Sequence, residues 1–300
     1  MKEYALFVGC MISSRFPQFE AATIKAFKKF KINLRQMKDW TCCPEPISMQ
    51  ILSLKSWYAI AARNICLAEN EGLDILTLCN GCNMTLFRAN KDLRSDDRLR
   101  AEINEYLKTF GKEFKGKITV KSMLSVLYKD VGLKTIHELV QNPLYGIKAA
   151  VHYGCHIFDE LKEYDNANDP TSLKNLVKAL GANVCTYQSE MLCCGGYARN
   201  INEEVSLEIV EEKLNDLSRI KTDCLILAGC PYCFLQFDLN QIILEHNLKK
   251  RYRIPILYYT QLLGLAMGFS AEDMGLQYHR VKVDRLLKKL ESREAIDFNV

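Results

Sequence analysis

The chain of 300 residues is long enough for one large domain or two of ordinary size, and its 48% hydrophobic and 25% charged residues are typical of a globular protein. Its formal net charge of +4 is mild and comes without a long basic run, so nucleic acid is not a predicted partner. The longest apolar stretch near the end, residues 254–269, is interrupted by a proline and several polar residues and falls short of a membrane span.

Four short apolar runs without polar alternation predict buried parallel strands, two in each half of the chain. They lie at residues 4–8, 74–78, 148–152 and 224–228. Amphipathic segments predict helices over residues 19–30, 48–71, 84–110, 171–180, 203–217 and 232–246. This alternation predicts an α/β fold of two pseudo-symmetric Rossmann-like halves, each a small, mostly parallel sheet flanked by helices.

Turn residues near residues 141–146 separate the halves, so we expect one domain over residues 1–145 and another over residues 146–300. The second domain includes an amphipathic helix around residues 281–290, which closes its own domain or docks a partner. Residues 1–8 read as a first strand and are too short for a secretory signal. We therefore expect a cytoplasmic protein, in which clustered cysteines are metal ligands more often than disulfides.

Ten of the thirteen cysteines form one pattern that occurs twice: a single Cys, an adjacent pair, and a Cys-x-x-Cys. In the first copy the gaps are 31 and 35 residues, and in the second they are 37 and 35. The single cysteines and the Cys-x-x-Cys pairs follow predicted strands, so their sulfurs can converge at one sheet edge in each half. The predicted ligands are Cys10, Cys42, Cys43, Cys79 and Cys82 in the first set, and Cys155, Cys193, Cys194, Cys230 and Cys233 in the second.

Five thiols are one more than a tetrahedral ion binds, and neighbouring side chains such as Cys42 and Cys43 diverge from a single ion. A multi-iron cluster offers several iron atoms and uses all five thiolates, so iron–sulfur ligation is favoured. Zinc sites, and disulfides or idle buried thiols, stay as alternatives. The remaining cysteines, Cys66, Cys185 and Cys224, are expected to be small core residues.

Beyond the cysteines, the chain resembles the cysteine-rich "CCG" domain family up to about residue 269, and within it the B subunits of heterodisulfide reductases. The resemblance rests on the segments FVGC (7–10), CCPEP (42–46), AARN (61–64), CNGC (79–82), VHYGCH (151–156) and QLLGLAMG (261–268). It implies a non-cubane [4Fe–4S] cluster in each five-cysteine set and the two-electron cleavage of the mixed disulfide of coenzyme M and coenzyme B. It also implies an iron–sulfur electron-relay subunit and a flavin-containing bifurcating subunit as partners.

The chain departs from that family pattern at a few positions. Pro44 follows the first cysteine pair in place of glycine, and Phe234 stands where a histidine is expected after the last Cys-x-x-Cys. Tyr258 and Tyr259 also replace more usual residues. If these positions contact the substrate, the resemblance leaves the exact identity of the disulfide open.

Two histidines flank the first cysteine of the second set, and we predict His152 and His156 as catalytic proton donors. The alternative is that they hydrogen-bond sulfurs or cap the following helix. Arg63 and Arg199 are candidate cations for an anionic substrate or simply solvated charges. The remaining histidines, His137, His246 and His279, are expected on the surface or on helices.

The duplicated pattern suggests a mechanism in which the disulfide lies between two clusters, because each cluster then receives one of the two sulfurs as a thiolate. The leading hypothesis is thus the catalytic subunit of a disulfide reductase. The alternatives are a non-catalytic electron-transfer subunit of another CCG-type oxidoreductase and a zinc-stabilised assembly subunit. The absence of a closely spaced ferredoxin motif places the electron relay on another polypeptide.

Overall fold

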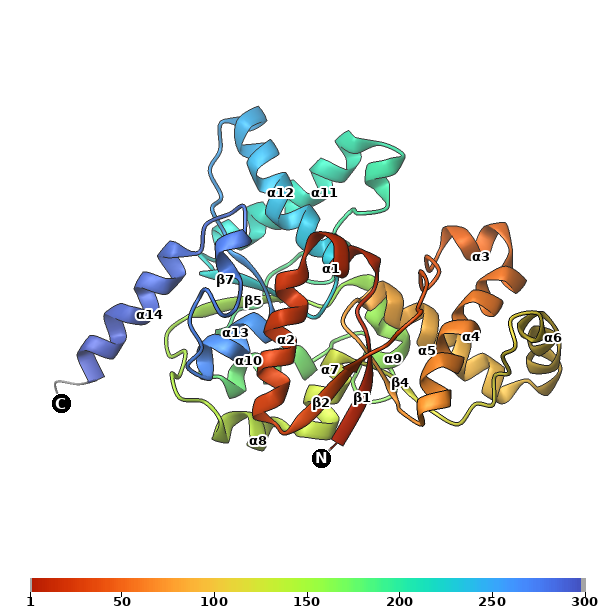
Figure 1. Ribbon diagram of the computed structural model, residues 1–300. Coiled ribbons are helices and arrows are strands. Elements are labelled where there is room, and N and C mark those ends of the chain that lie inside the picture. The colour runs from red at the N-terminus through yellow and green to blue at the C-terminus, as the bar shows by residue number, and fades with distance from the viewer. Residues whose placement is uncertain (1, 298–300) are drawn as a thin grey trace.

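The computed structural model describes residues 2–297, with side chains up to residue 292, and shows two α/β halves built on the same plan (Figure 1). The sheet of the first half has the order β2-β1-β3-β4, and that of the second has the order β6-β5-β7-β8. Every neighbouring pair is parallel, with Ala5 opposite Ile75 in the first sheet and Ala149 opposite Cys224 in the second. The strands are β1 (Lys2–Phe7), β2 (Ile32–Gln36), β3 (Ile75–Thr77), β4 (Val120–Ser122), β5 (Lys148–His152), β6 (Asn183–Val184), β7 (Cys224–Leu227) and β8 (Ile256–Tyr258).

Helices connect successive strands in both halves, as parallel pairing requires. In the first half they are α1 (Cys10–Arg15), α2 (Pro17–Lys29), α3 (Ser48–Leu52), α4 (Leu54–Glu71), α5 (Asn80–Ser95), α6 (Asp97–Lys108), α7 (Met123–Ser125), a π-helix (Val126–Val131) and α8 (Leu133–Glu138). In the second they are a 3₁₀ turn (Cys155–Ile157), α9 (Phe158–Leu161), α10 (Ser172–Ala179), a 3₁₀ turn (Ala198–Asn200), α11 (Glu203–Arg219), α12 (Pro231–Leu248), α13 (Tyr259–Ala266), a 3₁₀ turn (Leu276–Tyr278) and α14 (Asp284–Asp297).

Two of the predicted helices are divided by a residue that caps the next helix. The helix predicted over residues 48–71 breaks at Ser53, whose hydroxyl accepts a hydrogen bond from the Ser56 N–H. The helix predicted over residues 84–110 breaks at Asp96, whose carboxylate accepts one from the Leu99 N–H. Serine and aspartate cap helix N-termini well, and here this local bond outweighs the continuous amphipathic pattern.

The four predicted strands are confirmed as the central pair of each sheet, within one or two residues. The flanking strands β2, β4, β6 and β8 were not predicted. They are two to five residues long, and β2 carries polar side chains toward its exposed end, so none of them has a distinct apolar pattern. Tertiary pairing with the central strands, rather than local pattern, defines them.

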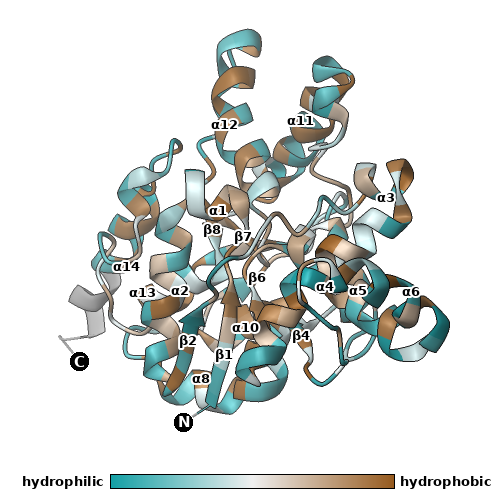
Figure 2. Ribbon diagram, turned by 45° about the vertical axis from the view of Figure 1, so that its right-hand side comes forward, coloured by the Kyte–Doolittle hydropathy of each residue, from teal (hydrophilic) through white to brown (hydrophobic). Residues whose placement is uncertain are grey.

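The two halves share a hydrophobic core. The Phe19 ring from α2 stacks on Tyr258 from β8, with 3.7 Å between ring centroids, and α2 packs along α13. A second apolar cluster lies within the first half, between α4 and α5. Figure 2 shows brown and teal alternating along α11 and α12, as expected for helices with one face toward a core. Helix α14 buries Leu286 in the shared core and then extends away from both sheets (Figure 1).

Both sheets have the same switch point. After β1 the chain crosses to β2 on one side and then to β3 on the other, and β5, β6 and β7 repeat this order. A crevice therefore opens beyond the carboxyl ends of β1 and β3, and another beyond β5 and β7. These are the positions at which the sequence places its cysteines.

Candidate metal centre

The single cysteines and the Cys-x-x-Cys pairs lie at the two switch points. Cys10 follows β1 and begins α1, and Cys155 follows β5 and begins a 3₁₀ turn. Cys79 and Cys230 are the residues immediately before α5 and α12, so each Cys-x-x-Cys occupies the first turn of a helix. The free N–H groups and the positive end of the helix dipole there stabilise thiolates.

A glycine before each single cysteine lets the backbone pass close to the Cys-x-x-Cys. Gly9 and Gly154 both have positive φ angles, +80° and +76°. A Cβ atom at Gly9 would lie 2.7 Å from the Sγ of Cys82, and one at Gly154 would lie 3.4 Å from the Sγ of Cys233. Only glycine combines this backbone conformation with this contact. The Gly-Cys dipeptides are thus a packing requirement of the sulfur sites.

The five thiols of each set are neighbours in a continuous series, and the series has the same order in both halves. The order is single cysteine, first of the pair, second of the pair, second of Cys-x-x-Cys, first of Cys-x-x-Cys. In the first half this series runs Cys10, Cys42, Cys43, Cys82, Cys79. In the second half it runs Cys155, Cys193, Cys194, Cys233, Cys230. All thirteen cysteines are free thiols.

All ten thiols line one cavity that opens to solvent. The single cysteine and the first member of each pair are exposed, whereas the second member of each pair and the last cysteine of each Cys-x-x-Cys are buried. The two sets therefore present matching members to the same opening. Remote segments of the sequence, residues 9–82 and 155–233, meet at one site.

This arrangement fits a multi-iron cluster better than a lone ion. The five thiols of a set are spread along a series of contacts. Different thiols can therefore bind different metal atoms of one cluster. No group of three or more His, Cys, Asp or Glu side chains within the described residues meets the geometry of a single-ion site. Residues that would hold iron–sulfur clusters are accordingly the ten thiols.

Contacts between thiols shift their pKa values in both sets. Hydrogen bonds from Cys42 and Cys82 lower the pKa of Cys43 to about 6. Hydrogen bonds from Cys155 and Cys194 lower the pKa of Cys193 to about 2. The contact with Cys42 raises the pKa of Cys10, and the contact with Cys193 raises the pKa of Cys155. Each set thus stabilises a thiolate within its own series, which is the ionisation state that a metal requires.

The sets are held together by the first Cys-x-x-Cys. The Asn80 amide donates a hydrogen bond to the backbone oxygen of Tyr153 at 2.7 Å, next to Gly154 and Cys155. The Asn80 N–H donates to the Gly229 oxygen at 2.9 Å, next to Cys230. A residue between two ligands of the first set therefore positions two ligands of the second. Its amide side chain within the CNGC segment was the available signal, but sequence analysis gave Asn80 no role of its own.

The two predicted proton donors lie at different places. His156 lines the cavity, and a Cβ at Gly81 of the first set would lie 3.6 Å from its Nδ1. His152 is buried behind the second set, with its Nε2 3.3 Å from the Sγ of Cys233, and its ring packs against Phe237. Burial lowers the pKa of both imidazoles, and that of His152 falls well below its usual range. Their roles as proton donors stay predictions.

Several other expectations need correction. His279 is not a surface residue: it is 2% exposed between the Phe19 and Phe234 rings, and burial lowers its pKa to about 4. Cys66 and Cys224 are buried as expected, whereas Cys185 follows a two-residue edge strand and is only partly buried. The burial of His279 and the partial exposure of Cys185 both depend on packing against distant segments, which a local sequence pattern does not reveal.

Neither candidate arginine lines the cavity. Arg63 donates to the Asp39 oxygen at 2.8 Å, and Arg199 pairs with Glu203 at 3.7 Å. Among the described residues that line the cavity, Glu45 is the one acidic residue, and there is no lysine or arginine. It accepts a hydrogen bond from the Tyr197 hydroxyl, a contact that joins the two halves across the opening. Sequence analysis missed both residues, although Glu45 lies two positions after a ligand.

Two parallel switch-point sheets with matched five-thiol sets around one cavity define a cysteine-rich α/β protein of two similar halves. The profile of the family described as "CCG: Cysteine-rich domain" matches residues 4–87 and 149–238, one segment in each half and more than half of the chain. The protein belongs to the cysteine-rich CCG domain family.

Named relatives cover nearly the whole chain. The B subunit of the ferredoxin:CoB-CoM heterodisulfide reductase of Methanosarcina mazei is 36% identical over 97% of both chains. The B subunit of the ferredoxin/F(420)H(2)-dependent CoB-CoM heterodisulfide reductase of Methanosarcina acetivorans is 37% identical over the same share of each. The 8-methylmenaquinol:fumarate reductase membrane anchor subunit of Wolinella succinogenes is 31% identical over 95% of this chain and 99% of its own.

A solved structure supports the fold. A hypothetical protein from Helicobacter pylori matches with a TM-score of 0.75 at 15% identity, over 94% of this chain. Our chain spans about half (52%) of the length of that protein. As to membranes, none of the helices in the described part of the chain has both the length and the apolar character needed to cross one.

Proposed function

We propose that this protein is the catalytic subunit of a heterodisulfide reductase. It would convert the mixed disulfide of coenzyme M and coenzyme B, with two electrons and two protons, into two thiols. The observation that carries this proposal is that both five-thiol sets open into one cavity, so that one small molecule can contact both. Relatives named as the B subunits of CoB-CoM heterodisulfide reductases support the choice of substrate.

We infer one non-cubane [4Fe–4S] cluster in each set, held by the ten cavity thiols. Such clusters would supply electrons one at a time and iron sites for the thiolate products. The exposed cysteines of each set would leave one edge of each cluster toward the cavity, while the buried thiols anchor it from below. His156 and His152 would provide protons or hydrogen bonds at the second set.

The cavity wall is suited to the central S–S bond rather than to charged ends of a substrate. Its lining is made of thiols, glycines, prolines, Met11, the aromatic rings of Tyr197 and Tyr232, and the polar side chains His156 and Glu45. Apolar and sulfur surfaces exclude water from a bond undergoing reduction. Anionic groups of the substrate would extend beyond the rim.

Electrons would come from an iron–sulfur relay subunit, supplied in turn by a flavin-containing bifurcating subunit, and the complex would be cytoplasmic. Names that describe the relatives as subunits support the existence of partners. We propose that each half, residues 1–145 and 146–300, is one cluster-binding domain. The two segments matched by the family profile, one in each half, support this division.

A second candidate is an electron-transfer subunit of another oxidoreductase. The relative named as a subunit of a fumarate reductase supports it. In that case the clusters would be reduced and reoxidised, but the protein would not turn over a disulfide.

Anaerobically purified protein tests the proposal in two measurements. Two four-iron clusters would give about eight iron and eight labile sulfide per chain. The mixed disulfide with reduced methyl viologen as electron donor should then yield two thiols per disulfide, and Cys66→Ala, outside both sets, should turn over like wild type. Zinc in place of iron would reject the cofactor, and full iron without turnover would favour the second candidate.

A further inference from the structure

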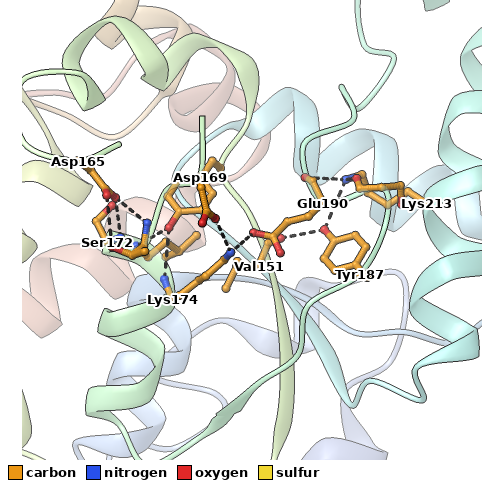
Figure 3. A network of polar contacts seen from close by, with 12 residues as sticks. Val151, Asp165, Asp169, Ser172, Lys174, Tyr187, Glu190 and Lys213 are labelled. Carbon is orange, nitrogen blue, oxygen red and sulfur yellow. Dashed lines mark hydrogen bonds and ion pairs between the residues drawn. The ribbon is translucent and has the colours of Figure 1, made fainter. Parts of the chain in front are cut away.

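Helix α11 carries a fully buried lysine behind the second thiol set. Lys213 is 0% exposed, and it is the one buried lysine or arginine among the described side chains. Its ammonium donates hydrogen bonds to the backbone oxygens of Ser189 and of Glu190, the latter at 3.1 Å, and lies 3.4 Å from the Tyr187 hydroxyl (Figure 3). These partners are neutral groups.

No carboxylate among the described side chains forms a direct ion pair with Lys213. Within the described side chains, no carboxylate oxygen lies within 4.0 Å of the Lys213 ammonium, and the Glu190 carboxylate is already paired with Lys174 at 2.8 Å (Figure 3). Burial lowers the pKa of Lys213 to about 8, and the nearby Cys233, Cys194 and Glu190 side chains oppose that shift. The group therefore stays largely charged at neutral pH. A buried charge is costly unless anionic groups lie nearby. The hydrogen bonds to the Ser189 and Glu190 oxygens place the ammonium against the loop that leads to Cys193, so the second thiol set and the Glu190 carboxylate are such groups.

The first half has a neutral residue at the matching position. Asn64 on α4 lies eight residues before Gly72, and Lys213 on α11 lies eight residues before Lys221. Gly72 and Lys221 both have positive φ and lead into the matching strands β3 and β7. Asn64 is also 0% exposed and also bonds the loop of its cysteine pair, donating to the Cys42 oxygen at 3.1 Å and accepting from the Thr41 N–H at 2.9 Å. Equivalent helices therefore support equivalent loops with an amide in one half and a cation in the other.

We propose that Lys213 is an electrostatic tuning residue that makes the second centre the more easily reduced of the two. This inference rests on the proposed iron–sulfur clusters. A nearby positive charge stabilises whichever redox state carries more negative charge, and low-dielectric surroundings strengthen that effect. Because Asn64 contributes no charge, the first centre lacks this stabilisation. Electrons entering the protein would therefore settle first on the second centre.

Lys213→Gln tests this proposal because glutamine keeps a hydrogen-bond donor for the loop and removes the charge. The readout is a redox titration of the iron-loaded protein, followed by electron paramagnetic resonance without substrate. A Cys43→Ser background, which lacks the first centre, assigns the signal. We expect the reduction equilibrium constant of the second centre to fall at least about tenfold, which for one electron is about 59 mV. Lys213→Arg keeps the charge and should restore most of the potential.

Lys250→Gln is the matched control, because Lys250 belongs to the same half but is exposed and paired with Glu211 at 2.9 Å. It should leave both potentials unchanged. An unmoved potential in iron-loaded Lys213→Gln, or an equal shift in Lys250→Gln, would overturn the inference and leave the proposed function intact. Wild-type protein that binds no iron would overturn both.

A second variant keeps the test independent of how well Lys213→Gln folds. Asn64→Asp places a negative charge at the matched position and keeps an oxygen for the Thr41 N–H. In a Cys194→Ser background, which leaves only the first centre, it should lower that centre's reduction equilibrium constant at least about tenfold. An unchanged constant would contradict the idea that this helix position controls its centre.

Discussion

The two halves of the molecule arrange their thiols alike but surround them differently. Both use a left-handed glycine before the single cysteine, a Cys-x-x-Cys in the first turn of a helix, and the same order of thiol contacts. Around these shared parts, the first half has Asn64 where the second has Lys213, and the second has two histidines beside its single cysteine. The geometry of the thiols is thus duplicated, whereas the buried lysine and the two histidines belong to the second half only.

This difference suggests a division of labour. Positions that determine where a sulfur lies are alike in the two halves, because the five thiols of a set must converge on one site. Residues behind the sulfurs, such as Asn64 and Lys213, can differ between the halves. A buried charge there acts on the thiol site through space and needs no contact with it. A reaction that moves two electrons in single steps benefits from two centres of equal geometry and unequal potential.

The largest expected effect comes from removing one buried ligand in either half. Cys43→Ser and Cys194→Ser each delete the central thiol of a series, so each should lose about half of the iron and sulfide. If one substrate needs both centres, each variant should also lose disulfide turnover at least about 100-fold. Iron analysis and turnover with reduced methyl viologen measure this. Full turnover by a variant with half the iron would show that the halves act independently.

A smaller effect distinguishes the two glycines. Alanine at Gly9 or Gly154 must adopt a positive φ, which costs about 1–3 kcal/mol of unfolding free energy. At Gly9 the new Cβ would also displace the Cys82 sulfur at 2.7 Å, so Gly9→Ala should lose its centre, whereas Gly154→Ala should retain more iron. Urea unfolding and iron content measure the two effects.

Gly72→Ala is the control for the glycine pair, because Gly72 has φ +66° and no atom within 4 Å of a new Cβ. It should lose stability through backbone strain but keep all of its iron. Equal iron loss in all three alanine variants would mean that strain, rather than sulfur packing, explains the Gly-Cys motif.

A pH-dependent effect reports on the seam between the halves. Glu160 of the second half is buried, and both of its oxygens accept from the Ser122 N–H of the first half, at 3.0 and 3.1 Å. Burial raises its pKa from 4.5 to about 7. The folded state therefore binds this proton more tightly than the unfolded state, so its contribution is fully present below pH 4.5 and is lost as the pH rises toward 7.

That loss amounts to about 3 kcal/mol of unfolding free energy between pH 4.5 and 7. Glu160→Gln, which stays neutral and keeps an acceptor, should remove this slope in urea unfolding of the apoprotein. Glu163→Gln is the comparison: Glu163 is exposed and pairs with Lys91 across the same seam at 3.0 Å, so it should change stability by less than about 1 kcal/mol. If the unfolding free energy of Glu160→Gln depends on pH as that of the wild type does, the thiols rather than Glu160 cause the pH dependence.

The smallest effects should come from the cysteines outside the two sets. Cys66→Ala and Cys224→Ala remove a buried thiol from each half and should each cost about 1 kcal/mol in urea unfolding. Cys185→Ala, at a partly exposed edge, should stay within about 0.5 kcal/mol. All three should keep full iron. Loss of iron in any of them would extend the ligand set beyond the repeated pattern.

Much of this molecule follows from local pattern. The central strands β1, β3, β5 and β7 are continuous apolar runs, and parallel burial on both faces requires such runs. Because each run ends in a cysteine motif, the sulfurs had to gather at the carboxyl ends of the sheets. The repeated spacing then predicts two similar sites without any knowledge of the flanking strands.

Contacts between the halves could not be obtained in this way. Both sets open into one cavity because Asn80 hydrogen-bonds to Tyr153 and Phe19 stacks against Tyr258. The two residues of each pair lie far apart in the sequence. The burial of Lys213 and His279 likewise depends on neighbours from distant segments, and a charged residue on an amphipathic helix ordinarily faces solvent. The sequence by itself determined the strands, the ligand types and their duplication, because these follow from short-range periodicity and spacing. Only tertiary packing decided that the two sites face each other and that one of them has a buried cation behind it, because burial and electrostatic fields are set by all surrounding elements at once.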